Sequence, residues 1–153
     1  MAETEAPAGS IGVLICDDVE LMRSLLRVIV ELREGLHVVG EAVDGEQAIA
    51  EAERLQPDVI LLDLSMPRLT GLDALPELKR VAPDAKLIVV SGFASSMISL
   101  DVLAHGADHY IEKGADPDTI AAAIAEIAGA PRPPEASAAA GRTVSTSAES
   151  DTA

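Results

Sequence analysis

Aromatic residues are almost absent from this sequence. Phe93 and Tyr110 are the only two in a chain of 153 residues, and there is no tryptophan. Hydrophobic residues nevertheless make up 48% of the chain, and a chain of this length can bury a real core as a single domain. The core is therefore predicted to be aliphatic.

Basic residues and cysteines are also scarce. The chain has 11 Lys and Arg against 26 Asp and Glu, for a formal net charge of −15. Nucleic acids and anionic membranes both require a basic face on the protein, so direct binding to either is disfavoured. Proteins and cations are the expected partners. Cys16 is the only cysteine, which excludes an internal disulfide, and its apolar surroundings predict a buried, inert thiol.

Long hydrophobic runs are missing as well. No apolar run approaches the roughly 20 residues that a membrane-spanning helix needs. The first ten residues, MAETEAPAGS, lack both the basic and the apolar region of a signal peptide. These absences, with the single thiol, predict a cytoplasmic protein that has no contact with a membrane.

Short apolar runs alternate with segments of helical periodicity from residue 11 to residue 129. A strand buried on both faces is predicted at 11–16, and further strands are predicted at 37–42, 58–63, 86–91 and 109–112. Helices are predicted at 19–34, 45–56, from 71 onward, 94–104 and 117–128, with Asp44 and Asp116 as caps. Pro76 lies within the third helix, where it is tolerable near the first turn but could displace the helix start.

This alternation predicts an α/β fold with a parallel sheet, right-handed crossovers and helices on both faces. Ligands of such folds bind outside the carboxyl ends of the strands. The first strand leads into Asp17 and Asp18, and the third into Asp63. The fourth strand ends in Ser91 and the fifth is followed by Lys113. These five side chains are therefore predicted to point into one crevice.

Three carboxylates around one point repel one another unless a cation lies between them. They suit Mg²⁺, which takes one or two carboxylates and completes its shell with water and phosphate oxygens. Asp63 is placed centrally and could form an aspartyl phosphate. Lys113 and Ser91 could then contact phosphoryl oxygens, and the backbone carbonyl of Ser65 could join the metal shell. The competing interpretation is a solvated turn in which Asp18 only caps a helix.

The motifs CDD, LLDLSMPRLTGL, VVSGF and GADHYIEKG follow one another on this frame. Segment 11–129 thereby resembles the receiver domain of bacterial two-component response regulators. The resemblance implies a flavodoxin-like doubly wound (βα)5 fold, with a five-stranded parallel sheet in the order 2-1-3-4-5. It also implies that Asp63 takes a phosphoryl group from a sensor histidine kinase or a histidine phosphotransfer protein. Asp17 and Asp18 would hold Mg²⁺, Lys113 would contact the phosphoryl group, and Tyr110 would act with Ser91 as a switch.

The sequence departs from the family in one place, because Gly114 follows Lys113 where many receivers have proline. The KGADPD segment instead resembles receivers of the helix-turn-helix regulator class. Segments 1–10 and 130–153 are predicted to be disordered. The second, rich in Pro, Ala, Ser and Thr, is too short for a helix-turn-helix output domain.

These observations leave three hypotheses. The first is a non-enzymatic receiver that switches its affinity for a downstream protein, or passes phosphate along a phosphorelay, with a phosphorylation-dependent homodimer as a further partner. The second is a receiver fragment of a DNA-binding transcriptional regulator. The third is a phosphohydrolase of external substrates. It is disfavoured because Leu64 and Ser65, next to Asp63, supply no second acid or base.

Overall fold

Five strands alternate with five helices along the described chain. The computed structural model describes residues 10–92 and 96–129, so the segments predicted to be disordered lie outside the described residues, except for Ser10. The elements are β1 (Ile11–Cys16), α1 (Glu20–Glu31), β2 (Leu36–Ala42), α2 (Gly45–Leu55), β3 (Val59–Leu62), α3 (Gly71–Val81), β4 (Lys86–Ser91), α4 (Ser96–Ala104), β5 (His109–Glu112) and α5 (Pro117–Gly129).

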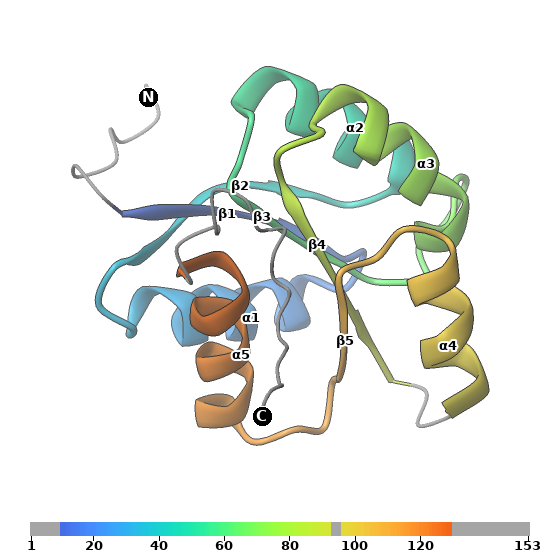
Figure 1. The fold of residues 1–153 in the computed structure, drawn as a ribbon. Helices are drawn as coiled ribbons and strands as arrows, with labels where there is room; N and C mark the ends of the chain where they lie inside the picture. Colours follow the sequence, from blue (N-terminus) through green and yellow to red (C-terminus); the bar gives the residue numbers. More distant parts are fainter. Residues whose placement is uncertain (1–9, 93–95, 130–153) are drawn as a thin grey trace, which may run out of the picture.

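The five strands form one parallel sheet in the order β2-β1-β3-β4-β5. Figure 1 shows α2 and α3 on one side of this sheet and α1 and α5 on the other. The predicted doubly wound topology is confirmed. Strand order reverses between β1 and β3, so the crevice of this fold lies at the carboxyl ends of those two strands.

Alternate residues of the central strands point into two aliphatic cores. Leu14, Ile60 and Leu87 belong to the core beneath α2, α3 and α4. Their neighbours along the strands, such as Ile15 and Leu61, belong to the core beneath α1 and α5. Because β1, β3 and β4 are buried on both faces, their sequences are continuous apolar runs and do not alternate with polar residues.

Side-chain caps mark the starts of α2 and α3. The Asp44 side chain accepts a hydrogen bond from the Gln47 N–H at the start of α2, as predicted. At the start of α3 the Thr70 hydroxyl accepts one from the Asp73 N–H at 3.2 Å. Of the two possibilities for Pro76, displacement of the start of α3 is not found. The Thr70 cap fixes the start at Gly71, and Pro76 is accommodated inside the helix.

The first helix is shorter than its apolar pattern predicts. The prediction was 19–34, whereas Val19 is the N-cap and Leu32 the C-cap. The Arg33 N–H reaches back three residues to the Val30 carbonyl, which tightens the final turn. Gly35 then takes a left-handed φ of 91°, a conformation that glycine adopts without steric cost. This turn directs the chain into β2.

Candidate functional site

Three carboxylates lie together at the carboxyl ends of β1 and β3. Asp17 and Asp63 are 1% and 4% exposed, whereas Asp18 is exposed. The Asp63 N–H donates to the Cys16 carbonyl at 2.9 Å, so the sheet ladder continues to the residue that carries the carboxylate. Oxygens of Asp17, Asp18 and Asp63 all lie within 4.8 Å of one another. The structure therefore brings the predicted acid cluster together.

Lys113 reaches this cluster from the end of β5. Its Nζ lies 2.8 Å from Oδ2 of Asp17 and 3.1 Å from Oδ1 of Asp63. The Lys113 N–H also donates to the Ser91 carbonyl at 2.8 Å, which ties the loop after β5 to the end of β4. The peptide bond before Gly114 is trans, as are the others in the described chain. The ammonium group therefore bridges two of the three acids.

Charge at the site is incompletely balanced. Burial raises the pKa of Asp63, and repulsion from Asp17 raises it further, while Lys113 opposes both effects. Burial would lower the pKa of Lys113, but its hydrogen bonds to Asp17 and Asp63 outweigh burial and raise that pKa. One ammonium group faces three carboxylates, so a divalent cation would make up the deficit of positive charge.

The donor set fits a hard cation such as Mg²⁺. Carboxylate oxygens are the side-chain ligands that this ion takes, and exposed Asp18 leaves room for the waters that it retains. Asp17 would be held in place for this role, because its Oδ1 accepts from the Val19 N–H at 2.9 Å. The backbone N–H of Ser65 opposes the rise in the pKa of Asp63. The loop predicted to supply a carbonyl ligand therefore borders the central carboxylate.

Ser91 and Tyr110 lie on the two strands beyond β3. Ser91 is the last residue of β4 and is 1% exposed. Tyr110 pairs with Val89 across the β4–β5 ladder and packs, half-buried, against the core beneath α2, α3 and α4. Ser91 thus ends the strand next to the one that leads into Asp63, while Tyr110 lies on the edge strand.

Cys16 ends β1 directly before the acid pair. The thiol is 1% exposed. Burial raises its pKa well above the usual range, and the neighbouring Asp17 charge adds to this. A thiol that stays protonated is a poor nucleophile and a poor metal ligand, so the predicted inert role agrees with its surroundings.

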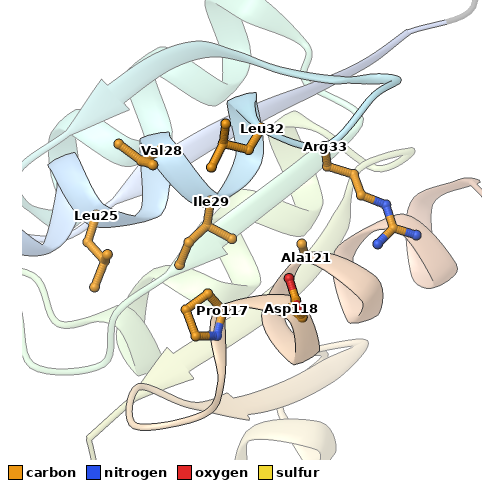
Figure 2. A pocket seen from close by; sticks show the side chains of 8 residues that line it. All are labelled: Leu25, Val28, Ile29, Leu32, Arg33, Pro117, Asp118 and Ala121. Carbon is orange, nitrogen blue, oxygen red and sulfur yellow. The ribbon is translucent and has the colours of Figure 1, made fainter.

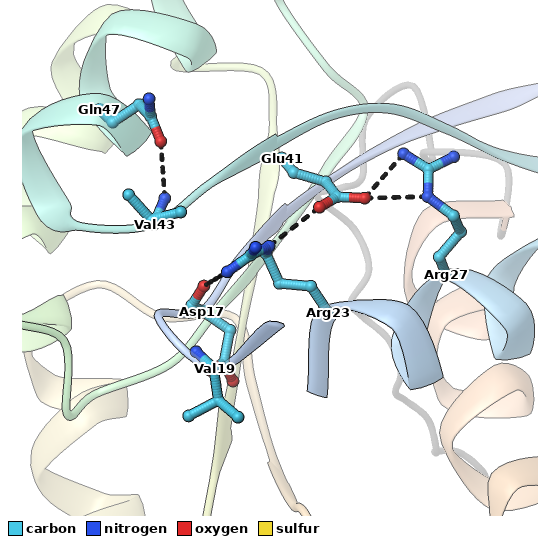
Figure 3. Close-up of polar contacts among 7 residues, drawn as sticks. All are labelled: Asp17, Val19, Arg23, Arg27, Glu41, Val43 and Gln47. Atoms are coloured by element: carbon cyan, nitrogen blue, oxygen red, sulfur yellow. Dashed lines mark hydrogen bonds and ion pairs between the residues drawn. The ribbon is translucent and has the colours of Figure 1, made fainter. Parts of the chain in front are cut away.

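An arginine that sequence reasoning missed supports the acid pair from α1. Arg23 donates from Nη1 to the Asp17 backbone carbonyl at 2.8 Å and from Nε to Glu41 at 2.9 Å (Figure 3). Glu41, on β2, also pairs with Arg27 at 2.8 Å. Burial would raise the pKa of Glu41, but the two arginines outweigh burial and lower it. The four-residue spacing of the arginines was the only signal in the sequence.

Gly71 closes the base of the loop that follows Asp63. Its N–H donates to the Leu64 carbonyl at 3.2 Å. A Cβ at position 71 would overlap the Asp63 carbonyl oxygen and would lie 2.9 Å from the Leu64 Cα. No side chain fits there without backbone movement, so the start of α3 is pressed directly against the residue that carries the central carboxylate.

An apolar hollow of about 290 Å³ lies between α1 and α5, apart from the acid cluster. Figure 2 shows Leu25 and Ile29 of α1 pointing toward Pro117 of α5, and Val28, Leu32 and Ala121 also line the hollow. Beside it, α1 carries a stripe of exposed apolar side chains, Leu21, Leu25, Val28 and Leu32. Arg33 and Asp118 also line the hollow, so it combines an apolar surface with one charge of each sign.

A doubly wound sheet with an acid trio and a lysine at one edge defines a receiver-like domain. The family model described as the response regulator receiver domain matches residues 13–125. The chain belongs to this family. Among the residues that the structure describes, no helix is both long and apolar enough to cross a bilayer.

Two curated relatives differ in how much of their length the chain spans. The chain is 33% identical over 115 residues to the chemotaxis protein CheY of Thermotoga maritima, covering 75% of this chain and 95% of that protein. It is 38% identical over 117 residues to the response regulator UvrY of Escherichia coli, covering 76% of this chain but only 54% of the relative. The chain thus spans about half of UvrY.

Solved structures share the fold. The CheX–CheY–BeF3–Mg²⁺ complex from Borrelia burgdorferi contains a chain that superposes with a TM-score of 0.72 at 26% identity. The match covers 76% of this chain and 88% of that one. The receiver fold is therefore supported by sequence and by structure.

Proposed function

We propose that this chain is a phosphorylation-controlled switch in which Asp63 accepts a phosphoryl group from a phosphohistidine. The observation that carries the proposal is the bridging position of Lys113, 2.8 Å from Asp17 and 3.1 Å from Asp63, beside a carboxylate cluster suited to Mg²⁺. A carboxylate oxygen of Asp63 attacks phosphorus and forms an aspartyl phosphate. The P–N bond breaks, and the imidazole nitrogen leaves with the electron pair and takes up a proton.

Each neighbouring group has a distinct role. Bound Mg²⁺, held by Asp17, Asp18, Asp63 and the Ser65 carbonyl, would neutralise charge on the transferring group. The ammonium group of Lys113 moves from carboxylate to phosphoryl oxygen and stabilises the charge that develops there. The Ser91 hydroxyl donates to another phosphoryl oxygen. The Borrelia CheY complex, which contains BeF3 and Mg²⁺, supports the pairing of a phosphoryl-like group with this metal.

The output is a change of affinity for a protein partner. Inward movement of Ser91 toward the phosphoryl group leaves a space, and the Tyr110 side chain moves into it. The surface of α4, β5 and α5 then rearranges. A downstream protein reads that surface, and a phosphorylated second copy of the chain is an alternative reader. The Borrelia CheY was solved with a protein partner, CheX, which supports this class of output.

The phosphoryl donor is a sensor histidine kinase or a histidine phosphotransfer protein. It must bring its histidine to the crevice, so its contacts fall on the elements around that edge. The exposed stripe Leu21, Leu25, Val28 and Leu32 lies on α1, which begins two residues after Asp18. An exposed apolar stripe of this kind suits docking of a protein partner.

The test is intact mass after incubation with acetyl phosphate, with and without Mg²⁺, for the wild type and Asp63→Asn. A Mg²⁺-dependent gain of one phosphoryl group that Asp63→Asn abolishes supports the proposal. A gain that persists in Asp63→Asn assigns the acceptor elsewhere and contradicts it. Hydrolysis of a generic phosphoester at a steady rate would instead support the phosphohydrolase hypothesis.

A second candidate is the receiver part of a DNA-binding regulator. The observation that favours it is the match to UvrY, of which the chain spans 54%. In both candidates residues 11–129 form the receiver unit. In the second candidate, a further domain would bind the nucleic acid. The native reading frame distinguishes the two, because a frame that ends at Ala153 contradicts the second.

A further inference from the structure

The loop that follows Asp63 is held by α2 as well as by its own base. In addition to the hydrogen bond between Gly71 and Leu64 at its base, the Leu69 carbonyl accepts a hydrogen bond from the Gly45 N–H at 3.0 Å. Next to it, Arg68 reaches Oδ2 of Asp44, with Nη2 at 2.6 Å and Nε at 3.2 Å. The tip of the loop is therefore attached to the N-terminus of α2 by one backbone bond and one forked ion pair.

Asp44 serves two elements at once. It is 5% exposed, and its Oδ1 caps α2 by accepting from the Gln47 N–H at 2.8 Å, while Oδ2 takes Arg68. A buried carboxylate is costly unless its oxygens are partnered. The Gln47 N–H and Arg68 together supply those partners, so α2 and the loop share one buried charge.

Arg68 holds a backbone conformation that arginine rarely adopts. Its φ is 63°, in the left-handed region, where a residue with a Cβ is strained unless its surroundings compensate. Its side chain is 65% exposed, so core packing does not account for this conformation. The ion pair to Asp44 is the side-chain contact that accompanies it.

The position of this loop matters for the metal and phosphoryl chemistry. Ser65 lies three residues before Arg68, its backbone N–H opposes the rise in the pKa of Asp63, and its carbonyl is the proposed metal ligand. Movement of the loop tip would move both groups. We propose that the Arg68–Asp44 ion pair is a positioning element of the phosphorylation site, which fixes the Ser65 backbone against Asp63 and thereby sets Mg²⁺ affinity. This inference rests on the proposed function.

The test compares Mg²⁺ dissociation constants, measured on the full chain from the amide NMR shifts of Ser65 and Asp63 during a Mg²⁺ titration. The variants are Arg68→Asn, Asp44→Asn and the double variant. Asparagine tolerates the left-handed conformation at position 68 and remains a good helix cap at position 44. We expect each single variant to raise the dissociation constant about tenfold, the lower end of the effect typical for residues that orient metal ligands.

The direction in which Arg68→Asn changes the Mg²⁺ dissociation constant separates positioning from bulk electrostatics. Removal of a positive charge makes the site more negative, so electrostatics alone would tighten Mg²⁺ binding, whereas loss of positioning weakens it. Arg80→Asn is the matched control. Arg80 is 69% exposed, pairs with Glu77 at 2.7 Å and lies in the last turn of α3, so it carries the same charge change away from the loop.

If the pair acts as a unit, the double variant is no weaker than either single variant. An unchanged or tighter Mg²⁺ affinity in Arg68→Asn overturns the inference, as does full additivity in the double variant. If the wild type binds Mg²⁺ but takes no phosphoryl group from acetyl phosphate, the proposed function fails while the positioning result still stands on the titration. Absence of Mg²⁺ binding by the wild type overturns both.

Discussion

Replacement of Gly71 by alanine tests how tightly the start of α3 is pressed against Asp63. An alanine Cβ would overlap the Asp63 carbonyl oxygen and lie 2.9 Å from both the Asp63 carbonyl carbon and the Leu64 Cα, whereas real Cβ atoms essentially never approach within 3.0 Å. The atoms in the way are backbone, so relief requires the loop to move as a whole. Overpacking of this kind costs about 1–3 kcal/mol.

Helix propensity opposes this cost, so the direction of the net change in stability is informative. Alanine is the better helix former, and in a helix interior it is favoured over glycine by about 0.5–1 kcal/mol. Gly71→Ala should therefore lower the free energy of unfolding by about 1 kcal/mol net, measured by urea denaturation without Mg²⁺. Gly114→Ala is the control, because nothing lies within 4 Å of its Cβ. A Gly71→Ala variant as stable as the wild type, or more stable, would refute the close approach.

Three further results are expected. Asp63→Asn should raise the melting temperature at pH 7 without Mg²⁺ by about 4 °C, since it removes repulsion from Asp17. Because the folded pKa of Asp63 is raised, calorimetry should show this gain shrinking as pH falls through that pKa. Glu41→Gln should cost about 0.5–1 kcal/mol after solvent screening. The folded pKa of Glu41 is lowered, so the difference should vanish as pH falls through it, and a pH-independent cost would contradict the ion-pair account. Leu32→Gln at an 82% exposed position should stay within about 0.5 kcal/mol of the wild type in urea denaturation, whereas Ile29→Ala should cost about 2–5 kcal/mol.

The strand ends could be predicted from sequence because the parallel topology converts order along the chain into proximity. Continuous apolar runs indicate buried strands, and helical periodicity between them forces each crossover. Asp17, Asp63 and Lys113 then share one edge although 96 positions separate the first from the last. Their spacing alone carries no such information.

The supporting contacts could not be predicted in the same way. Arg68 lies in an irregular loop, and its partner Asp44 is 24 residues away in the sequence. Neither hydrophobic periodicity nor strand register therefore links the two residues. Arg23 contacts a backbone carbonyl, which every residue possesses. Such contacts depend on loop conformation and rotamer, and a hydrophobic pattern specifies neither.

The buried acids of the site work against the stability of the fold around them. The cores on both faces of the sheet are aliphatic and buried. The strands that build them nevertheless end in buried acids, whose negative charge one lysine only partly offsets. Local choices in a stable sequence normally agree with the fold, and exceptions concentrate at functional sites. Binding of a cation by the native state alone would remove the conflict and stabilise the domain by mass action. Mg²⁺ should therefore raise the melting temperature of the wild type more than that of Asp63→Asn, because the variant has lost both a ligand and the repulsion that the ion relieves.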